Sequence, residues 1–380
     1  MIDLGQALRT RKVIVCVGSG GVGKTTLAAS LGLKAAAEGR KVIVCTIDPA
    51  KRLANALGLP ALGNVETRID PARLAAAGLH PRGELWALML DLKRSWDDFI
   101  TSSLPPDKAA AVLENRFYRT LSSALAGSQE YIAMEKLSEL SASGRWDLVV
   151  LDTPPTAHAL DFLDAPNRIL DFLGGDAARV LLGPALAAGR VGLRFFHLGG
   201  SFIARNLSKL TGTETLEELA RFMIEVSGSY EVFKERAAEV KALLASDGAA
   251  FVLVTSAQAF TVDEAIYFHA LLAGERMPIA AVVANRVHED PLDGLSTPTP
   301  EALADALLRE GLADGGHPPL STRLAHTAAE GRALARLDER HLARLAAATE
   351  PTPLRRVPRF DLDVYDLAGL WKIAGHLEGR

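Results

Sequence analysis

The sequence contains little cysteine: only Cys16 and Cys45 occur among its 380 residues. Both lie inside apolar runs, VIVCVG and VIVCTID. Two isolated thiols within apolar runs exclude a disulfide framework and indicate buried cysteines in a reducing compartment.

Long hydrophobic runs and a large net charge are also lacking. The longest uninterrupted apolar stretch, Val180–Gly189, is far shorter than the roughly 18 residues that span a bilayer. The first residues, MIDLGQALRTRK, do not follow the cationic-then-apolar order of a signal peptide. The formal net charge is −4, which gives no basic surface for nucleic acid. We therefore expect a cytoplasmic protein without a nucleic-acid partner.

What the sequence does contain is an alternation of short Val/Ile-rich runs with long helical patterns. The runs are apolar almost throughout, which is typical of strands buried on both faces of a parallel sheet. The pattern predicts an α/β fold, a mostly parallel twisted sheet flanked by helices. The expected strands are Lys12–Gly18, Lys41–Ile47, Leu85–Leu90, Trp146–Leu151, Ala250–Thr255 and Ile279–Val283.

Two stretches do not follow this alternation, and they suggest the domain organisation. Residues 164–245 contain no convincing strand and are expected to form an inserted helical subdomain between core segments 1–163 and 246–380. Residues 287–350 are rich in Pro, Gly and Ala and are expected to form a helical extension of the core, a lid or an arm, with a helix starting at Thr299-Pro300. Capping boxes are predicted at Thr261 with Glu264 and at Thr215 with Glu218.

Residues 18–26 read GSGGVGKTT, directly after the first expected strand and at the start of a helix. This is the phosphate-binding pattern G-x-x-x-x-G-K-[ST] in its required strand–loop–helix context. The glycines let backbone N–H groups approach phosphate oxygens, and the helix directs its positive end at the anion. The lysine reaches the β- and γ-phosphates, and the hydroxyl binds Mg²⁺. The candidate binding residues are Gly20, Gly21, Val22, Gly23, Lys24, Thr25 and Thr26.

Two aspartates stand at strand ends, where such a site requires acidic groups. Asp152 ends the strand WDLVVLD, in the position of a carboxylate that holds Mg²⁺. Asp48 ends KVIVCTID and is a candidate to orient the attacking water or to accept its proton. The alternative for either residue alone is a solvated cap of the strand.

The segments GSGGVGKTT, IDPAKRL at 47–53 and LDTPPTAHAL at 151–160 resemble the phosphate loop and two switch segments of the arsenite-pump and tail-anchored-protein-targeting ATPases. The resemblance implies a P-loop NTPase that uses ATP and Mg²⁺ as a dimer with facing nucleotide sites. It implies that Asp48 is the catalytic aspartate and a metal-site residue, acting with Lys24. It also implies that Thr25 is the Mg²⁺ ligand and that Asp152 is the outer carboxylate.

The same resemblance assigns the recognition of the base. Asn285, after the strand AAVVA, matches the adenine-reading asparagine of the family, and Pro358 falls where the C-terminal segment borders the base. An amide also offers both a donor and an acceptor to the adenine edge. Asn285 alone is alternatively a turn residue at a strand end.

The chain departs from the family at Ser19, where the signature lysine reaches the phosphates of the partner subunit. Because a hydroxyl carries no charge, we expect a homodimer of this chain to hydrolyse ATP slowly. A heterodimer with a paralogous ATPase that carries the lysine is the alternative, in which this chain is a nucleotide-binding regulatory subunit. Lys51 or Arg52 is a further source of charge, unless both are simply exposed at a helix start.

The family resemblance also bears on partners. No C-x-x-C pair is present and residues 164–245 contain no cysteine, which disfavours a zinc-clamped dimer and arsenite binding. The apolar, arginine-dotted stretch 171–205 suggests a groove for a membrane-protein client or a contact with a membrane partner, or else the core of the subdomain itself. The expected function is an ATPase that couples nucleotide-driven dimer closure to the handling of such a partner.

Overall fold

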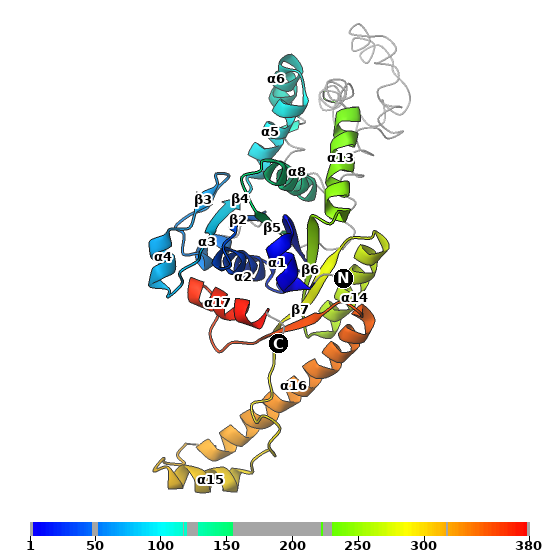
Figure 1. The fold of residues 1–380 in the computed structure, drawn as a ribbon. Helices are drawn as coiled ribbons and strands as arrows, with labels where there is room; N and C mark the ends of the chain where they lie inside the picture. The colour runs from blue at the N-terminus through cyan, green and yellow to red at the C-terminus, as the bar shows by residue number, and fades with distance from the viewer. Residues whose placement is uncertain are drawn as a thin grey trace, which may run out of the picture.

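The computed structural model describes residues 3–47, 52–116, 118–119, 128–154, 222, 230–316 and 318–377. The described strands form one sheet in the order β3-β4-β2-β5-β1-β6-β7-β8 (Figure 1). Every neighbouring pair is parallel except β3 with β4. This confirms the predicted α/β class. The strands are β1 (Val13–Val17), β2 (Lys41–Thr46), β3 (Thr67–Arg68), β4 (Glu84–Met89), β5 (Leu148–Asp152), β6 (Ala249–Ser256), β7 (Ile279–Val287) and β8 (Leu354–Pro358).

All six strands expected from the sequence are present, and two further ones were missed. The two missed strands are the edges of the sheet. β3 has two residues, and β8 carries two arginines and is only partly buried. Edge strands bury little apolar surface, so they lack the continuous Val/Ile pattern by which the central strands are detected.

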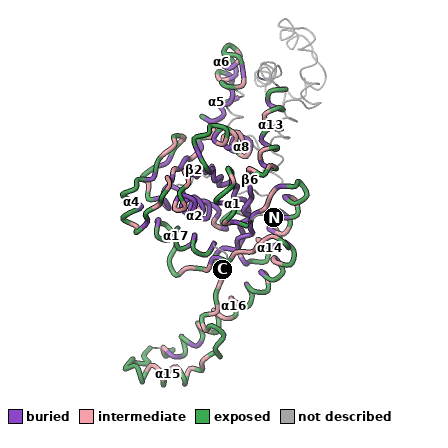
Figure 2. Tube along the Cα trace, viewed as in Figure 1, coloured by how far each residue is buried: buried purple, intermediate pink, exposed green. Residues whose placement is uncertain are grey.

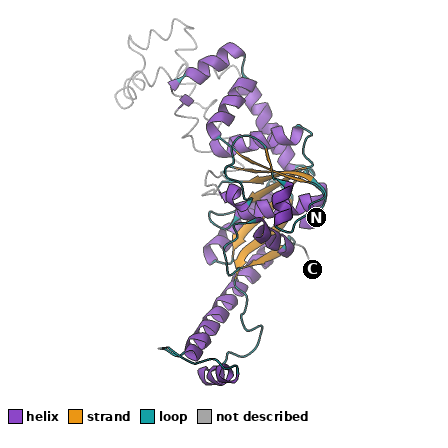
Figure 3. Ribbon diagram, turned by 90° about the vertical axis from the view of Figure 1, so that its left-hand side faces the viewer, coloured by secondary structure: helices purple, strands orange, loops and turns teal. Residues whose placement is uncertain are grey.

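Helices cover both faces of the sheet (Figures 1 and 3). Within a strand, successive residues alternate between two cores. Ile14 belongs to the core that includes residues of α1, α2 and α17, whereas Val13 belongs to the core that includes residues of α8, α13, α14 and α16. The central strands are buried on both faces (Figure 2). The described helices are α1 (Leu4–Thr10), α2 (Lys24–Ala37), α3 (Arg52–Ala56), α4 (Pro71–Ala76), α5 (Leu92–Ser103), α6 (Pro106–Glu114), α8 (Ser128–Ala142), α13 (Tyr230–Ala245), α14 (Ala259–Gly274), α15 (Pro300–Arg309), α16 (Leu320–Thr349) and α17 (Leu367–His376).

A group of helices stands beyond one end of the sheet. Phe99 of α5 and Phe233 of α13 meet edge to face with ring centroids 5.0 Å apart, and Arg236 of α13 lies 3.5 Å from Glu135 of α8. The helical part of the molecule therefore includes chain from before residue 164. Most of the expected insertion 164–245, including Thr215 and Glu218, lies outside the described residues, so these boundaries stay a prediction.

The predicted extension 287–350 is helical. α15 begins at Pro300 with Thr299 as its N-cap, as predicted from the Thr-Pro pair. α16 is 30 residues long, and its C-terminal half is anchored on the sheet through the buried Leu342 and Leu345. Its N-terminal half runs away from the sheet with α15, which has no buried residue (Figures 1 and 2). Here α15 and the N-terminal half of α16 are called the arm.

The predicted capping box at Thr261 and Glu264 is wrong. The N-cap of α14 is Gln258, three residues before Thr261, and the helix begins at Ala259. The Thr261 hydroxyl instead donates back to the carbonyl of Ser256, at 3.1 Å, and to that of Gln258. The Glu264 carboxylate accepts from the hydroxyl of Ser19.

Candidate functional site

The segment GSGGVGKTT forms the turn between β1 and α2, and two of its glycines allow it to pack tightly. Gly18 has φ +142°, and a Cβ there would lie 2.0 Å from the carbonyl oxygen of Val254. Gly23 has φ +97°, and a Cβ there would lie 2.3 Å from Nδ2 of Asn285. Neither position admits a side chain without displacing its neighbour, so these glycines are required by the loop itself.

Lys24 is the first residue of α2, and its side chain folds back over this loop. Its Nζ donates to the carbonyl oxygens of Gly18, at 2.8 Å, and Ser19, at 2.9 Å. Lys24 and Thr25 are both buried, beside the positive end of the helix. The loop therefore holds a cation and a hydroxyl where an anion would meet backbone N–H groups.

Asp152 lies at the end of β5 next to this loop. It is 1% exposed, and its Oδ2 accepts a hydrogen bond of 2.7 Å from Oγ1 of Thr46 at the end of β2. Its register partner on β1 is Cys16. Burial is the main cause that raises the pKa of the Cys16 thiol; the negative charge of Asp152 raises it further and the positive charge of Lys24 lowers it. The charges of Asp152 and Lys24 thus both act close to the end of β1.

Both cysteines are free and buried, as predicted. Burial raises the pKa of the Cys45 thiol to about 12. Within the part of the chain that the structure describes, no three His, Cys, Asp or Glu side chains gather as a metal site.

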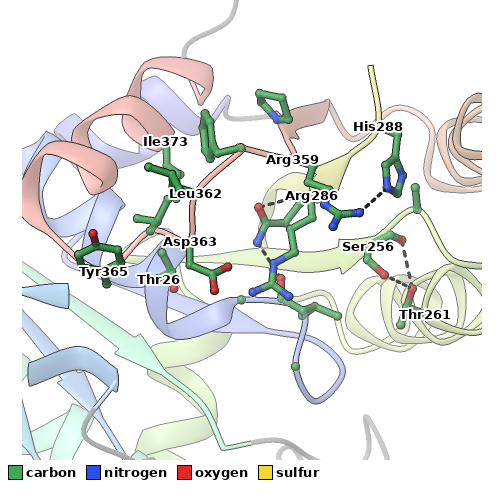
Figure 4. A pocket seen from close by; sticks show the side chains of 18 of the residues that line it. Thr26, Ser256, Thr261, Arg286, His288, Arg359, Leu362, Asp363, Tyr365 and Ile373 are labelled. Carbon is green, nitrogen blue, oxygen red and sulfur yellow. Dashed lines mark hydrogen bonds between the residues drawn. The ribbon is translucent and has the colours of Figure 1, made fainter. Parts of the chain in front are cut away.

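A cavity of about 1240 Å³ opens beside the phosphate loop (Figure 4). Its lining contains most of the predicted binding residues: Gly20, Gly21, Val22, Gly23, Thr26, Asn285 and Pro358. Nδ2 of Asn285 donates to the carbonyl of Val22 at 2.8 Å, and its Oδ1 accepts from the backbone N–H of Arg286. Because an amide has two donor hydrogens and two lone pairs, Asn285 retains capacity for a ligand while bracing the loop.

Asp48 and Lys51 lie outside the described residues. Arg52, the other cation considered beside Ser19, starts α3 and lines the cavity. Stretch 171–205, the expected client groove, is also outside the described part.

Several lining residues escaped the sequence reasoning. They include Arg286, the first residue after Asn285, with φ +59°, and Arg359, the first after β8. His288 and Asp338 also line the cavity, from the end of β7 and from α16. Arg286 directly follows Asn285, Arg359 directly follows Pro358, and His288 directly follows the last residue of β7. A position next to a candidate residue or at the end of a strand is the one signal in the sequence that would have found them.

Ser19 contacts a residue far away in the sequence. Its hydroxyl donates to the carboxylate of Glu264 on α14. A lysine at this position would therefore face a carboxylate of its own chain.

The sequence comparisons agree with this geometry. Residues 11–182 match the sequence model of the anion-transporting ATPases. The chain is 30% identical over 159 residues to the ATPase GET3 of Malassezia globosa, covering 42% of this chain and 44% of that protein. It is 31% identical over 176 residues to a putative arsenical pump-driving ATPase of Halobacterium salinarum, covering 45% of this chain and 26% of that protein.

A more distant relative matches over a longer range. The ATPase GET3C of Arabidopsis thaliana is 23% identical over 295 residues, covering 74% of this chain and 68% of that protein. The matches to the first two relatives span less than half of each relative's length. None of the described helices is both long enough and apolar enough to cross a membrane.

Proposed function

Because residues 11–182 match the sequence model of the anion-transporting ATPases, we propose that this chain binds ATP with Mg²⁺ and hydrolyses it as a switch protein of the ArsA/GET type. The observation that carries the proposal is the loop between β1 and α2. Gly18 and Gly23 are packed without room for a Cβ, the lysine is folded over the loop, and the loop opens on a cavity that also contains Asn285.

In the proposed reaction the phosphates lie on the loop between Gly20 and Thr26. The Lys24 ammonium exchanges its carbonyl partners at Gly18 and Ser19 for phosphate oxygens. Together with the loop N–H groups it stabilises the charge that develops on the transferred phosphoryl group. Asp48, two residues beyond the end of β2, orients the attacking water.

The oxygen donors near the loop fit Mg²⁺. This ion prefers one or two protein oxygens and completes its shell with water and phosphate. Thr25 would bind it directly and Asp152 through water, with Thr46 holding the Asp152 carboxylate in place. When bound, Mg²⁺ neutralises charge on the phosphates.

The wider biological role rests on the family alone. We propose a cytoplasmic dimer whose closure around nucleotide is coupled to a membrane-protein client or a transport partner. The contact between Ser19 and Glu264 favours the second candidate, a regulatory subunit with weak ATPase activity that pairs with a lysine-bearing paralogue. In that heterodimer the paralogue's lysine supplies the charge that Ser19 lacks.

Phosphate release by the full chain tests the proposal. We expect slow, Mg²⁺-dependent ATP hydrolysis, lost in Asp48→Asn without loss of ATP binding. Turnover that Asp48→Asn leaves unchanged would overturn the assigned mechanism. Stimulation by a co-purifying, lysine-bearing ATPase would select the regulatory subunit over the homodimeric enzyme.

A further inference from the structure

α16 is fastened to the rim of the proposed nucleotide cavity near residue 338. Oδ2 of Asp338 accepts hydrogen bonds from the backbone N–H and from Nδ1 of His288, each 2.8 Å long. One turn later, Nδ1 of His341 donates to the carbonyl of Ala257, at 2.7 Å. Ala257, His288 and Asp338 all line the cavity. The seat of α16 is therefore built from walls of the cavity.

His288 connects this seat to Arg359. Its Nε2 lies 3.0 Å from Nη1 of Arg359, whose backbone N–H donates to Val287. A guanidinium only donates and a carboxylate only accepts, so both contacts are satisfied by the neutral imidazole with its proton on Nδ1. Asp338 is 7% exposed, and its contact with Nδ1 fixes the tautomer of His288. This tautomer leaves Nε2 as an acceptor for Arg359, and Figure 4 shows His288 and Arg359 facing each other.

Arg359 is exposed and lines the same cavity as the phosphate loop and Asn285. A guanidinium carries five N–H donors in a fixed plane, and the contact with His288 uses one of them. The backbone N–H of Arg359 is bonded to Val287, two residues beyond Asn285. If the phosphates lie on the loop and the base lies toward Asn285, Arg359 is therefore on the nucleoside side of the cavity.

We propose that Asp338 and His288 are positioning residues that present the guanidinium of Arg359 to the nucleoside part of a bound nucleotide, and that α16 is thereby coupled to nucleotide binding. This inference rests on the proposed function. Since α16 continues into the arm, nucleotide binding then stabilises the seat from which the arm projects.

A double-mutant cycle tests the positioning role, because residues that act through one another give non-additive effects. Calorimetric titration of the full chain with Mg·ADP compares the wild type, Asp338→Asn, Arg359→Gln and the double variant. We expect each single change to weaken binding about 3- to 10-fold, as for a hydrogen bond to a charged group. The double variant should bind no more weakly than Arg359→Gln alone.

Glu339→Gln is the matched control. Glu339 is the next residue of α16 and pairs with Arg356 at 2.6 Å, but neither of them lines the cavity. Glu339→Gln should leave the affinity for Mg·ADP unchanged. Hydrogen exchange provides a second readout: Mg·ADP should slow exchange around residues 336–342 in the wild type and not in Arg359→Gln. If Asp338→Asn does not fold, His288→Ala takes its place in the cycle.

The outcomes separate the two proposals. A wild-type chain without affinity for Mg·ADP overturns the proposed function and this inference together. A wild type that binds, with Arg359→Gln binding equally well, overturns the inference alone. Additive losses in the double variant show that Asp338 acts independently of Arg359 and also overturn it.

Discussion

The hydroxyl of Ser19 in the phosphate loop donates a hydrogen bond to the carboxylate of Glu264 in α14. Glu264 therefore places a negative group beside the phosphate loop and next to Ser19. Ser19 stands at the position where the family resemblance implies a lysine. Because like charges repel, we expect the Glu264 carboxylate to oppose the binding of phosphate charge rather than support it.

This relationship predicts how a restored lysine behaves. In Ser19→Lys the new ammonium pairs with Glu264 of its own chain, so ATP turnover should rise little. In the double variant with Ser19→Lys and Glu264→Gln, the lysine no longer pairs with a carboxylate, and ATP turnover should rise at least tenfold. This is a small part of the roughly 10³–10⁵-fold increase in rate that cations acting in trans supply in other phosphoryl-transfer enzymes. Steady-state phosphate release measures both, with Glu264→Gln alone as control. Fast turnover of the wild type that neither variant increases would contradict the assigned role of Ser19.

Gly23→Ala should damage the loop through Asn285. A Cβ at residue 23 meets Nδ2 of Asn285 at 2.3 Å, whereas one at Gly21 meets nothing within 4 Å, although both glycines have positive φ. Both alanine variants share a backbone strain of about 1–2 kcal/mol, so Gly21→Ala is the matched control. We expect Gly23→Ala to lose Mg·ADP affinity at least tenfold more than Gly21→Ala, measured by calorimetry. Equal affinities in the two variants would show that the contact with Asn285 does not shape the loop.

Thr46→Val should show how much the hydrogen bond from Thr46 to the buried Asp152 contributes to stability. Valine keeps the shape of threonine but cannot donate to Oδ2 of the buried carboxylate. Loss of this donor should lower the free energy of unfolding by about 1–3 kcal/mol, measured by urea denaturation. Thr10→Val, which removes an exposed hydroxyl bonded to the carbonyl of Gln6, should cost less than about 0.5 kcal/mol. An equal loss of stability in Thr46→Val and Thr10→Val would show that the hydrogen bond from Thr46 to Asp152 does not stabilise the fold.

Glu135 predicts a pH dependence in the helical part. Burial raises the pKa of its carboxyl, and the hydrogen bond from Tyr131 and the positive charge of Arg236 at 3.5 Å only partly offset this. A carboxyl whose pKa is raised on folding favours the folded state when protonated, and this contribution is lost as the pH rises through that pKa. Glu135→Gln should therefore gain stability over the wild type from pH 5 to pH 8, measured by thermal unfolding. Glu139→Gln, at the exposed Glu139 of the same helix, should show no such gain. A difference in stability between Glu135→Gln and the wild type that does not change from pH 5 to pH 8 would refute the prediction.

The central strands and the phosphate loop were predictable because their signals are local. Continuous Val/Ile runs mark strands buried on both faces, and the loop pattern lies within nine residues. The contacts that distinguish this chain are not local: Ser19 meets Glu264, and Asp338 meets His288 50 residues away. β8 was missed because an edge strand with two arginines has no apolar pattern. The capping box failed because both of its side chains bond elsewhere.

Calorimetric titration with Mg·ATP, comparing the wild type with Lys24→Ala, tests the central claim most directly. Lys12→Ala, at an exposed lysine before β1, is the control for loss of a positive charge. The proposed site predicts Mg²⁺-dependent binding by the wild type and by Lys12→Ala, and an affinity at least about tenfold lower in Lys24→Ala. Equal affinity in Lys24→Ala, or no Mg²⁺-dependent binding by the wild type, would contradict it.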